Sequence, residues 1–248
     1  MQKTFLFLFF FINYSLIKSQ TTITFLAKDS VVVTADLYFI NDSLPYVILC
    51  HQAGYSRGEY RETAWKFMKL GFNCVAVDAR SGKEVKGVEN ETAISARELG
   101  KPTGYLDAEK DIVAAINYGY KKSGRQVLLV GSSYSAGLAM KIGAKSSKVK
   151  AVIAFSPGEY FGDGFSLKGA IGGFSKPLFV TSARSESGDV SVLISGIKLG
   201  VVVQFVPKEE GVHGASALWK TTANYNEYWR EVILFVCRLY KGNSVSCK

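Results

Sequence analysis

The chain has 248 residues, of which 48% are hydrophobic and 21% are charged, and this composition suits one globular domain with a sizeable core. No Pro- or Ser-rich linker divides it, and no internal repeat is visible. The formal net charge is +9, but the lysines are scattered and lack interleaved aromatic residues, so the pattern disfavours a nucleic-acid partner. The densest group is typical of a solvated helix face and comprises Lys141, Lys145, Lys148 and Lys150.

Four cysteines are too few for a disulfide scaffold in a chain of this length. Cys50 and Cys74 lie within apolar runs, and we expect them to pack as small hydrophobic side chains. Cys237 and Cys247 lie near the C-terminus, and we expect that they can form a disulfide in an oxidising compartment. No CxxC motif or His/Cys cluster appears, so we expect no metal and no other cofactor.

The first 19 residues have the form of a secretory signal. Lys3 precedes the short apolar run Thr4–Ile12, which is too short to span a bilayer as a stable anchor. We therefore expect cleavage after Ser19, a mature domain over residues 20–248, and a secreted or periplasmic location without a stable membrane anchor. An uncleaved N-terminal anchor is the alternative.

The remaining chain begins with two predicted strands, residues 22–26 and 31–39, joined by a tight turn into a hairpin. Apolar strands then alternate with segments of helical spacing. The further predicted strands are residues 45–50, 72–78, 127–130, 149–155, 178–181 and 201–206. The predicted helices are residues 57–70, 91–99, 106–120, 190–197 and 225–240. One further helix is predicted after the turn at 131–137 and ends near residue 145. This order predicts an α/β protein whose mostly parallel sheet has an antiparallel N-terminal hairpin and helices on both faces.

Three closely spaced serines follow the apolar run Val127–Val130, which predicts a buried strand. The segment Gly131–Ser135 has the Gly-x-Ser-x-small form of a nucleophile elbow, in which a tight strand-to-helix corner lifts one serine oxygen above the sheet. Ser133 is the predicted nucleophile. Ser135 is the alternative, although the strand would then have to continue two residues past its apolar run. A serine here is also common as a plain helix N-cap.

A serine nucleophile needs a base, and the chain holds two histidines. His213 follows the last predicted strand, which matches the order serine, acid, histidine, so it is the predicted base. His51 follows the third strand and is expected to be structural. The acid that orients the base is predicted to be Glu186, in the loop after the strand at 178–181. Asp189, in the same loop, and Glu159 are the alternatives.

Acyl transfer also requires hydrogen-bond donors for the oxyanion that develops in the transition state. The N–H of Tyr134, directly after the predicted nucleophile, is one expected donor. The other is expected from the turn after the third strand, where the amide of Ala53 or of Gln52 is available.

These segments occur in an order that resembles the α/β-hydrolase superfamily, and they are most similar to its dienelactone-hydrolase-like branch. The segments that carry the resemblance are Ala35–Tyr38, His51–Tyr60, Asp78–Gly82, Gly131–Gly137 and Gly211–Gly214. The resemblance covers the whole expected mature chain and implies a single α/β-hydrolase domain over residues 20–248.

The chain departs from the family pattern in several places. Gln52 stands where the family usually has glycine, and Ser135 replaces the second glycine of the elbow. Dienelactone hydrolases use a cysteine where this chain has Ser133, so the resemblance implies a serine esterase. The usual triad aspartate aligns best with Ser185, and residues 159–176 are too short for a large cap domain.

The predicted function is hydrolysis of small carboxylic esters through an acyl-enzyme intermediate, with a small-molecule ester as the partner. One alternative is a peptidase or acyl-aminoacyl hydrolase on the same triad, because esters and amides share the mechanism. Another is a catalytically silent hydrolase fold used for binding. A nucleotide site is disfavoured because no Gly-Lys-Ser/Thr or Gly-x-Gly-x-x-Gly motif appears.

Overall fold

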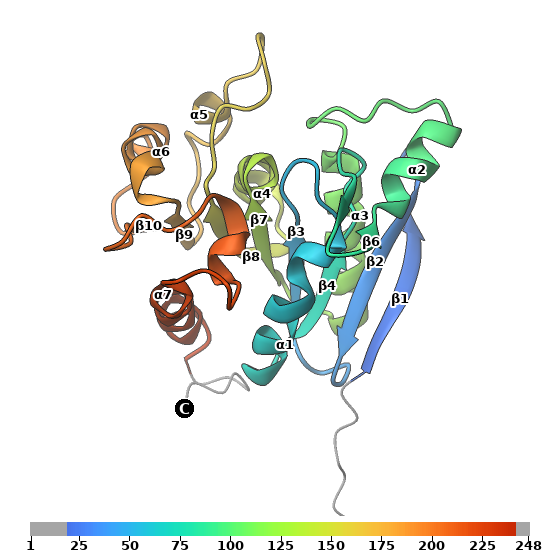
Figure 1. The fold of residues 1–248 in the computed structure, drawn as a ribbon, viewed down its shortest axis with the longest axis horizontal. Coiled ribbons are helices and arrows are strands. Elements are labelled where there is room, and N and C mark those ends of the chain that lie inside the picture. The colour runs from blue at the N-terminus through green and yellow to red at the C-terminus, as the bar shows by residue number, and fades with distance from the viewer. Residues whose placement is uncertain (1–18, 242–248) are drawn as a thin grey trace, which may run out of the picture.

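The computed structural model describes residues 19–241 of the chain (Figure 1). The predicted signal sequence, apart from Ser19, and Cys247 lie outside these residues. The cleavage after Ser19 and the pairing of Cys237 with Cys247 therefore stay predictions. Within residues 19–241, no helix is long and apolar enough to cross a bilayer.

One mixed sheet organises the described residues, and its eight strands follow the order β1-β2-β4-β3-β7-β8-β9-β10. These strands are β1 (Ser19–Leu26), β2 (Val32–Phe39), β3 (Tyr46–Cys50), β4 (Asn73–Val77), β7 (Val127–Ser132), β8 (Val149–Phe155), β9 (Leu178–Thr181) and β10 (Val202–Phe205). β1 pairs antiparallel with β2, and β2 pairs antiparallel with β4. All later neighbours in the sheet pair in parallel.

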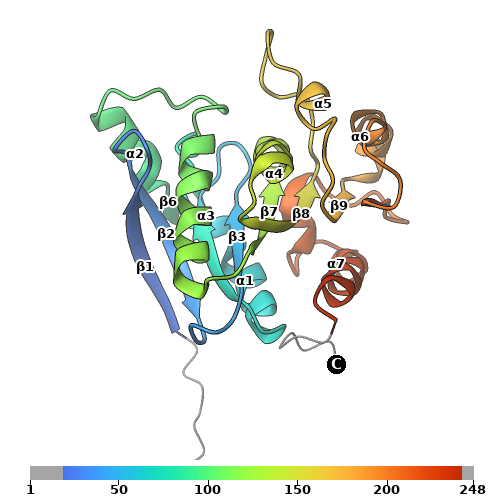
Figure 2. The same cartoon turned by 180° about the vertical axis from the view of Figure 1, so that it is seen from behind.

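Helices cover both faces of this sheet. The α-helices are α1 (Arg61–Lys69), α2 (Glu91–Glu98), α3 (Glu109–Ser123), α4 (Tyr134–Lys145), α5 (Leu167–Ala170), α6 (Ser187–Ile194) and α7 (Tyr225–Leu239), and the 3-10 helices are η1 (Arg57–Tyr60), η2 (Arg184–Glu186) and η3 (Gly214–Leu218). α1 and α7 pack on one face, and α3, α4 and α6 on the other, as the opposite views of Figures 1 and 2 show. Every residue of β3, β4 and β7 is buried, as expected for strands with helices on both faces. The predicted fold class is confirmed.

The structure also corrects some predicted boundaries. α3 begins three residues later than predicted, because residues 105–108 form a turn whose hydrogen bonds, such as that from the Glu109 N–H to the Leu106 carbonyl, span only three residues. Next to this turn, the Tyr105 ring stacks on Tyr134 with centroids 4.5 Å apart. α3 ends at Gly124, whose φ of 65° is the left-handed conformation of a helix C-cap. The short hairpin of β5 (Glu84–Val85) and β6 (Val88–Glu89) lies in a segment predicted as loop. Cys50 and Cys74 are buried free thiols, as predicted.

The backbones of β7 and α4 nearly touch at Gly131. A Cβ at this position would lie 2.4 Å from the Ser135 carbonyl oxygen and 2.5 Å from the Ala136 Cα. Backbone atoms on both sides leave no flexible group that could yield. Glycine at position 131 therefore sets how closely the helix follows the strand, and with it the turn between them.

Replacing Gly131 by Ala is expected to lower the free energy of unfolding by about 3 kcal/mol or more, because the added methyl group displaces backbone. The matched control is Gly188→Ala on the exposed surface of α6, where nothing lies within 4 Å of the new Cβ. That change is expected to raise the free energy of unfolding by about 0.5–1 kcal/mol, because alanine favours helix. Urea unfolding followed by circular dichroism measures both, and equal effects would contradict the contact at Gly131.

Candidate active site

Ser133 occupies the corner between β7 and α4. Its φ of 58° and ψ of −125° are strained for a residue with a side chain, and the Gly131 contact enforces this turn. The Ser133 N–H donates to the Phe155 carbonyl at 2.8 Å, which ties the corner to the end of β8. The backbone therefore has the conformation that the elbow motif predicts.

The two candidate serines differ in accessibility. Ser133 is 7% exposed, whereas Ser135 is fully buried on the first turn of α4. The Ser135 hydroxyl donates to the Cys50 carbonyl at 2.7 Å and accepts the Ser132 N–H at 2.9 Å. Ser135 thus joins the end of β3 to the elbow, which explains a serine where the family pattern has glycine. Of the two serines, the geometry leaves Ser133 accessible to a substrate.

The structure brings His213 and Glu186 together. His213 Nδ1 lies 2.5 Å from Glu186 Oε1. The other carboxylate oxygen, Oε2, accepts the Ser156 hydroxyl at 2.6 Å and the Ala183 N–H at 3.1 Å. Ser156 Oγ also accepts the Gly214 N–H at 3.0 Å, so it joins the acid to the residue that follows the histidine.

The alternative acids have other roles. Glu159 accepts the Leu167 N–H at 2.6 Å and the Lys168 N–H at 2.9 Å, and it therefore caps α5. Asp189 is exposed in the first turn of α6. Of the three predicted candidates, Glu186 is the carboxylate in contact with His213.

The ion pair shifts the pKa values of both partners. The hydrogen bond with Glu186 raises the pKa of His213 above its ordinary value of 6.5, although burial opposes this. Burial pushes the pKa of Glu186 upward, but the hydrogen bonds from His213 and Ser156 outweigh it and lower the pKa. Glu186 is therefore a carboxylate at neutral pH and favours the protonated form of the imidazole.

Tyr160, from the loop after β8, contacts both Ser133 and His213. Its ring lies edge-on to the His213 ring with centroids 6.5 Å apart, and its hydroxyl donates to the Ser156 carbonyl at 3.0 Å. The Ser133 side chain interacts with the same phenol and acts to lower its pKa. Among the described residues, Ser133 Oγ forms no hydrogen bond with His213. Both side chains nevertheless face one aromatic ring at one edge of the sheet.

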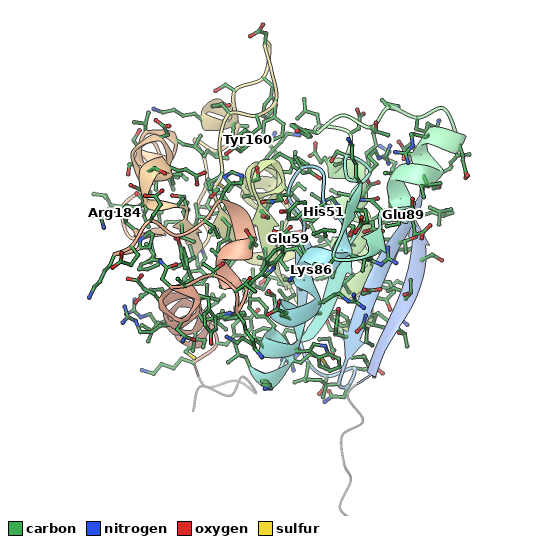
Figure 3. All side chains as sticks on the ribbon, viewed as in Figure 1. His51, Glu59, Lys86, Glu89, Tyr160 and Arg184 are labelled. Carbon is green, nitrogen blue, oxygen red and sulfur yellow. The ribbon has the colours of Figure 1, made fainter. Side chains whose placement is uncertain are left out.

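Glycine at position 158 leaves the space that the Tyr160 ring occupies. A Cβ at Gly158 would lie 2.7 Å from the ring carbon that carries the hydroxyl. Burial and the nearby charge of Glu186 raise the pKa of Tyr160, so the phenol stays neutral. Figure 3 shows Tyr160 near the end of α4, with His51 and Glu59 below it in that view.

The predicted oxyanion donors both have free amides. Tyr134 is the first residue of α4, so its N–H has no partner within that helix. The Ala53 N–H forms no hydrogen bond among the described residues. The Gln52 N–H, the alternative donor, is already bound to Glu59 Oε2 at 2.8 Å. This leaves Ala53 as the donor from the turn after β3.

His51 fixes the orientation of the Ala53 amide. Its Nε2 accepts the Ala79 N–H at 2.9 Å, so Nδ1 carries the proton and donates to the Gln52 carbonyl at 2.7 Å. In a trans peptide the carbonyl and the following N–H point in opposite directions, so holding the Gln52 oxygen aims the Ala53 N–H away from it. Burial lowers the pKa of His51 to about 4, which keeps the ring neutral. His51 is structural, as predicted.

A cavity of about 410 Å³ lies beside Tyr160 and Glu186. Its lining combines apolar side chains of α6 with residues of the loop after β8. The lining residues are Pro157, Gly158, Glu159, Tyr160, Lys168, Glu186, Asp189, Val190, Val192 and Leu193. Its volume falls in the range of pockets for small organic molecules.

Four side chains that complete this site were not predicted from the sequence: Glu59, Ser132, Ser156 and Tyr160. Each acts through a partner far along the chain, and hydrophobic spacing gives no signal for such contacts. A tyrosine in a glycine-rich loop directly after a strand end was the one local signal available for Tyr160.

No protein-family model matches the chain, and no curated protein matches its sequence. Solved structures do match it. An esterase of Pyrococcus furiosus has a TM-score of 0.69 at 17% identity, covering 90% of this chain and 92% of that one. A dienelactone hydrolase of Anabaena variabilis has a TM-score of 0.65 at 14% identity, covering 87% and 94%. An alpha/beta hydrolase of a Penicillium species has a TM-score of 0.69 at 10% identity, covering 89% and 98%. The chain is thus similar to esterases and dienelactone hydrolases in structure, and its fold is the α/β-hydrolase fold.

Proposed function

We propose that this protein is a serine hydrolase that cleaves small carboxylic esters through an acyl-enzyme intermediate. The observation that carries the proposal is Ser133 in a strained corner, at the same edge of the sheet as a histidine whose Nδ1 is hydrogen-bonded to the partly exposed carboxylate of Glu186. The free amides of Ala53 and Tyr134 support it, because an acyl-transfer site needs donors for an oxyanion. The esterases and dienelactone hydrolases of similar structure support the same class of reaction.

In the first half of the proposed reaction, Ser133 Oγ attacks the ester carbonyl carbon while its proton passes to Nε2 of His213. The carbonyl oxygen becomes negatively charged and is stabilised by the N–H groups of Ala53 and Tyr134. Glu186 holds Nδ1 and stabilises the imidazolium. The carbon–oxygen bond to the alcohol then breaks, and His213 returns its proton to the leaving alkoxide.

The second half repeats these steps with water. His213 takes a proton from the water, which attacks the acyl carbon, and the bond to Ser133 Oγ breaks. The carboxylic acid leaves, and the serine regains its proton from His213. In this scheme the Ser133 hydroxyl has to exchange its interaction with Tyr160 for a hydrogen bond with His213.

The cavity beside Tyr160 is proposed to receive one substituent of the ester. Val190, Val192 and Leu193 give it an apolar wall, and its volume suits a short chain or a single ring. The loop after β8 adds no large cap over this cavity. We therefore propose small esters with an apolar substituent as the substrate class.

Replacing Ser133 by Ala is expected to lower kcat/KM for p-nitrophenyl acetate by about 10⁴-fold or more and to abolish labelling by a fluorophosphonate probe. Ser135→Ala is the matched control, because it removes a buried hydroxyl of the same elbow. The control is expected to keep labelling at residue 133, located by peptide mass spectrometry. Labelling that survives Ser133→Ala would rule out this nucleophile.

The rate is expected to fall as the pH drops through the pKa of His213, which lies above 6.5, because only the neutral imidazole accepts the serine proton. Glu186→Gln is expected to lower kcat by about 10²- to 10⁴-fold, because the imidazolium loses its counter-charge. It is also expected to move the His213 ionisation to lower pH, since the bond to Glu186 raises that pKa. An unmoved ionisation in the variant pH–rate profile would contradict the pairing.

Replacing Tyr160 by Phe is expected to raise kcat/KM about fivefold, because it frees the Ser133 hydroxyl from an interaction with the phenol of about 1 kcal/mol. Tyr105→Phe serves as the control, since this exposed ring stacks on Tyr134 and, among the described residues, forms no hydrogen bond with Ser133. A fall in kcat/KM for Tyr160→Phe would show instead that the phenol assists the reaction.

A further inference from the structure

Glu59, in η1, is a fully buried carboxylate that the proposed mechanism does not use. A buried carboxylate requires hydrogen-bond donors for its oxygens. Its Oε2 accepts the Gln52 N–H at 2.8 Å, and its Oε1 accepts the Ser132 hydroxyl at 2.8 Å. The first bond reaches the turn after β3, and the second reaches the residue before Ser133.

The Ser132 hydroxyl extends this contact to a third loop. Its oxygen accepts the Ala215 N–H at 2.8 Å, two residues after His213. A single buried carboxylate therefore joins the chain segments after β3, β7 and β10. These segments carry the Ala53 amide, the Ser133 hydroxyl and the His213 imidazole.

The hydrogen-bond directions fit the ionised form of Glu59. The Gln52 N–H can only donate, and the Ser132 hydroxyl, which accepts from Ala215, has its own proton available for Glu59. Both oxygens of Glu59 consequently accept. A proton on Oε2 would meet the Gln52 N–H, which can only donate, and a proton on Oε1 would require the Ser132 hydroxyl to turn its own proton away from Glu59.

We propose that Glu59 is a positioning residue whose ionised carboxylate keeps the Ala53 amide, Ser133 and His213 in the relative positions that the reaction requires. This inference rests on the proposed serine-hydrolase function. It adds a second ionisation to the activity: hydrolysis requires both a neutral His213 and an ionised Glu59.

The burial of Glu59 places this second ionisation near neutral pH, and the charges around it oppose the shift. Burial raises the pKa of Glu59 to about 7, against the lowering effects of its bonds to Gln52 and Ser132. His213 from the loop after β10 and Lys86 from the β5–β6 turn favour the ionised form. The other titratable groups near it are neutral there, because burial raises their pKa values; these are Cys50 of β3, Tyr60 of η1 and Tyr134 of α4.

The first test compares pH profiles of kcat/KM for the wild type, Glu59→Gln and the exposed control Glu98→Gln. In the wild type and the control, log kcat/KM is expected to approach a slope of about two at acid pH, because two protons inactivate the site. Glu59→Gln is expected to give a slope of about one and, above pH ~8, a loss of about tenfold or more. A merely structural defect would lower the rate at all pH values with the slope unchanged. A slope of one in the wild type would overturn the proposal.

Ser132→Ala is a second variant that keeps the carboxylate. The bond from Ser132 lowers the pKa of Glu59, so its loss raises that pKa. The acid limb of the profile is then expected to move to higher pH. An unmoved limb in this variant would also overturn the proposal, including the case in which Glu59→Gln does not fold.

Thermal unfolding separates this inference from the proposed function, because it needs no substrate. The pKa of Glu59 is higher in the folded than in the unfolded chain, so its stabilising contribution is full below the unfolded value and is lost as pH rises through about 7. The Tm of Glu59→Gln minus that of the wild type is therefore expected to increase between about pH 5 and about pH 8. A constant difference overturns the ionisation of Glu59. If the fluorophosphonate probe failed to label Ser133 while the Tm difference still increased with pH, only the catalytic role of the site would be overturned.

Discussion

The near-contact of β7 with α4 at Gly131 is the constraint on which the rest of the site depends. It forces Ser133 into a conformation with φ of 58°, which costs on the order of 1–3 kcal/mol for a residue with a side chain. The free energy gained by burying the sheet offsets this cost, since every residue of β3, β4 and β7 is buried. The same corner leaves the Tyr134 N–H without a helical partner. One steric contact thus both raises the candidate nucleophile and frees an amide beside it.

The second requirement is that loops from separate strands keep a fixed relation to this corner. Side chains provide it here. Ser135 binds the end of β3, Glu59 joins the turn after β3 to Ser132, and Ser156 joins Glu186 to the residue after His213. Each of these groups is buried or nearly so, where hydrogen bonds are little weakened by competing water. The rigidity of the site therefore comes from buried polar side chains, and few of these side chains reach its accessible surface.

The sequence predicted those parts of the structure that local patterns determine. The strands are apolar runs covered on both faces, and the elbow is a short motif whose glycine has a steric cause, so both could be found without coordinates. The choice of Glu186 was weaker, because any carboxylate after β9 fits the chain order, and only its contact with His213 separates it from Asp189. Glu59 lies 73 residues from Ser132, and no periodicity reveals such a pair. The late start of α3 was not predicted either, because a turn over residues 105–108 replaces the first residues of the expected helical pattern.

The two glutamates near His213 are the same residue type in opposite environments. Glu186 is partly exposed and hydrogen-bonded to the imidazole, so its pKa is lowered, whereas burial raises the pKa of Glu59 to about 7. Both negative charges raise the pKa of His213, which makes it a stronger base but leaves less of it neutral at a given pH. In the proposed mechanism, a stronger base helps to remove the serine proton, and both carboxylates stabilise the imidazolium that results. Since Glu59 itself loses its charge as the pH falls, this support weakens under the same conditions in which His213 becomes protonated. The proposed reaction therefore couples the buried carboxylate to the histidine, and it is expected to be favoured only above the ionisation of both.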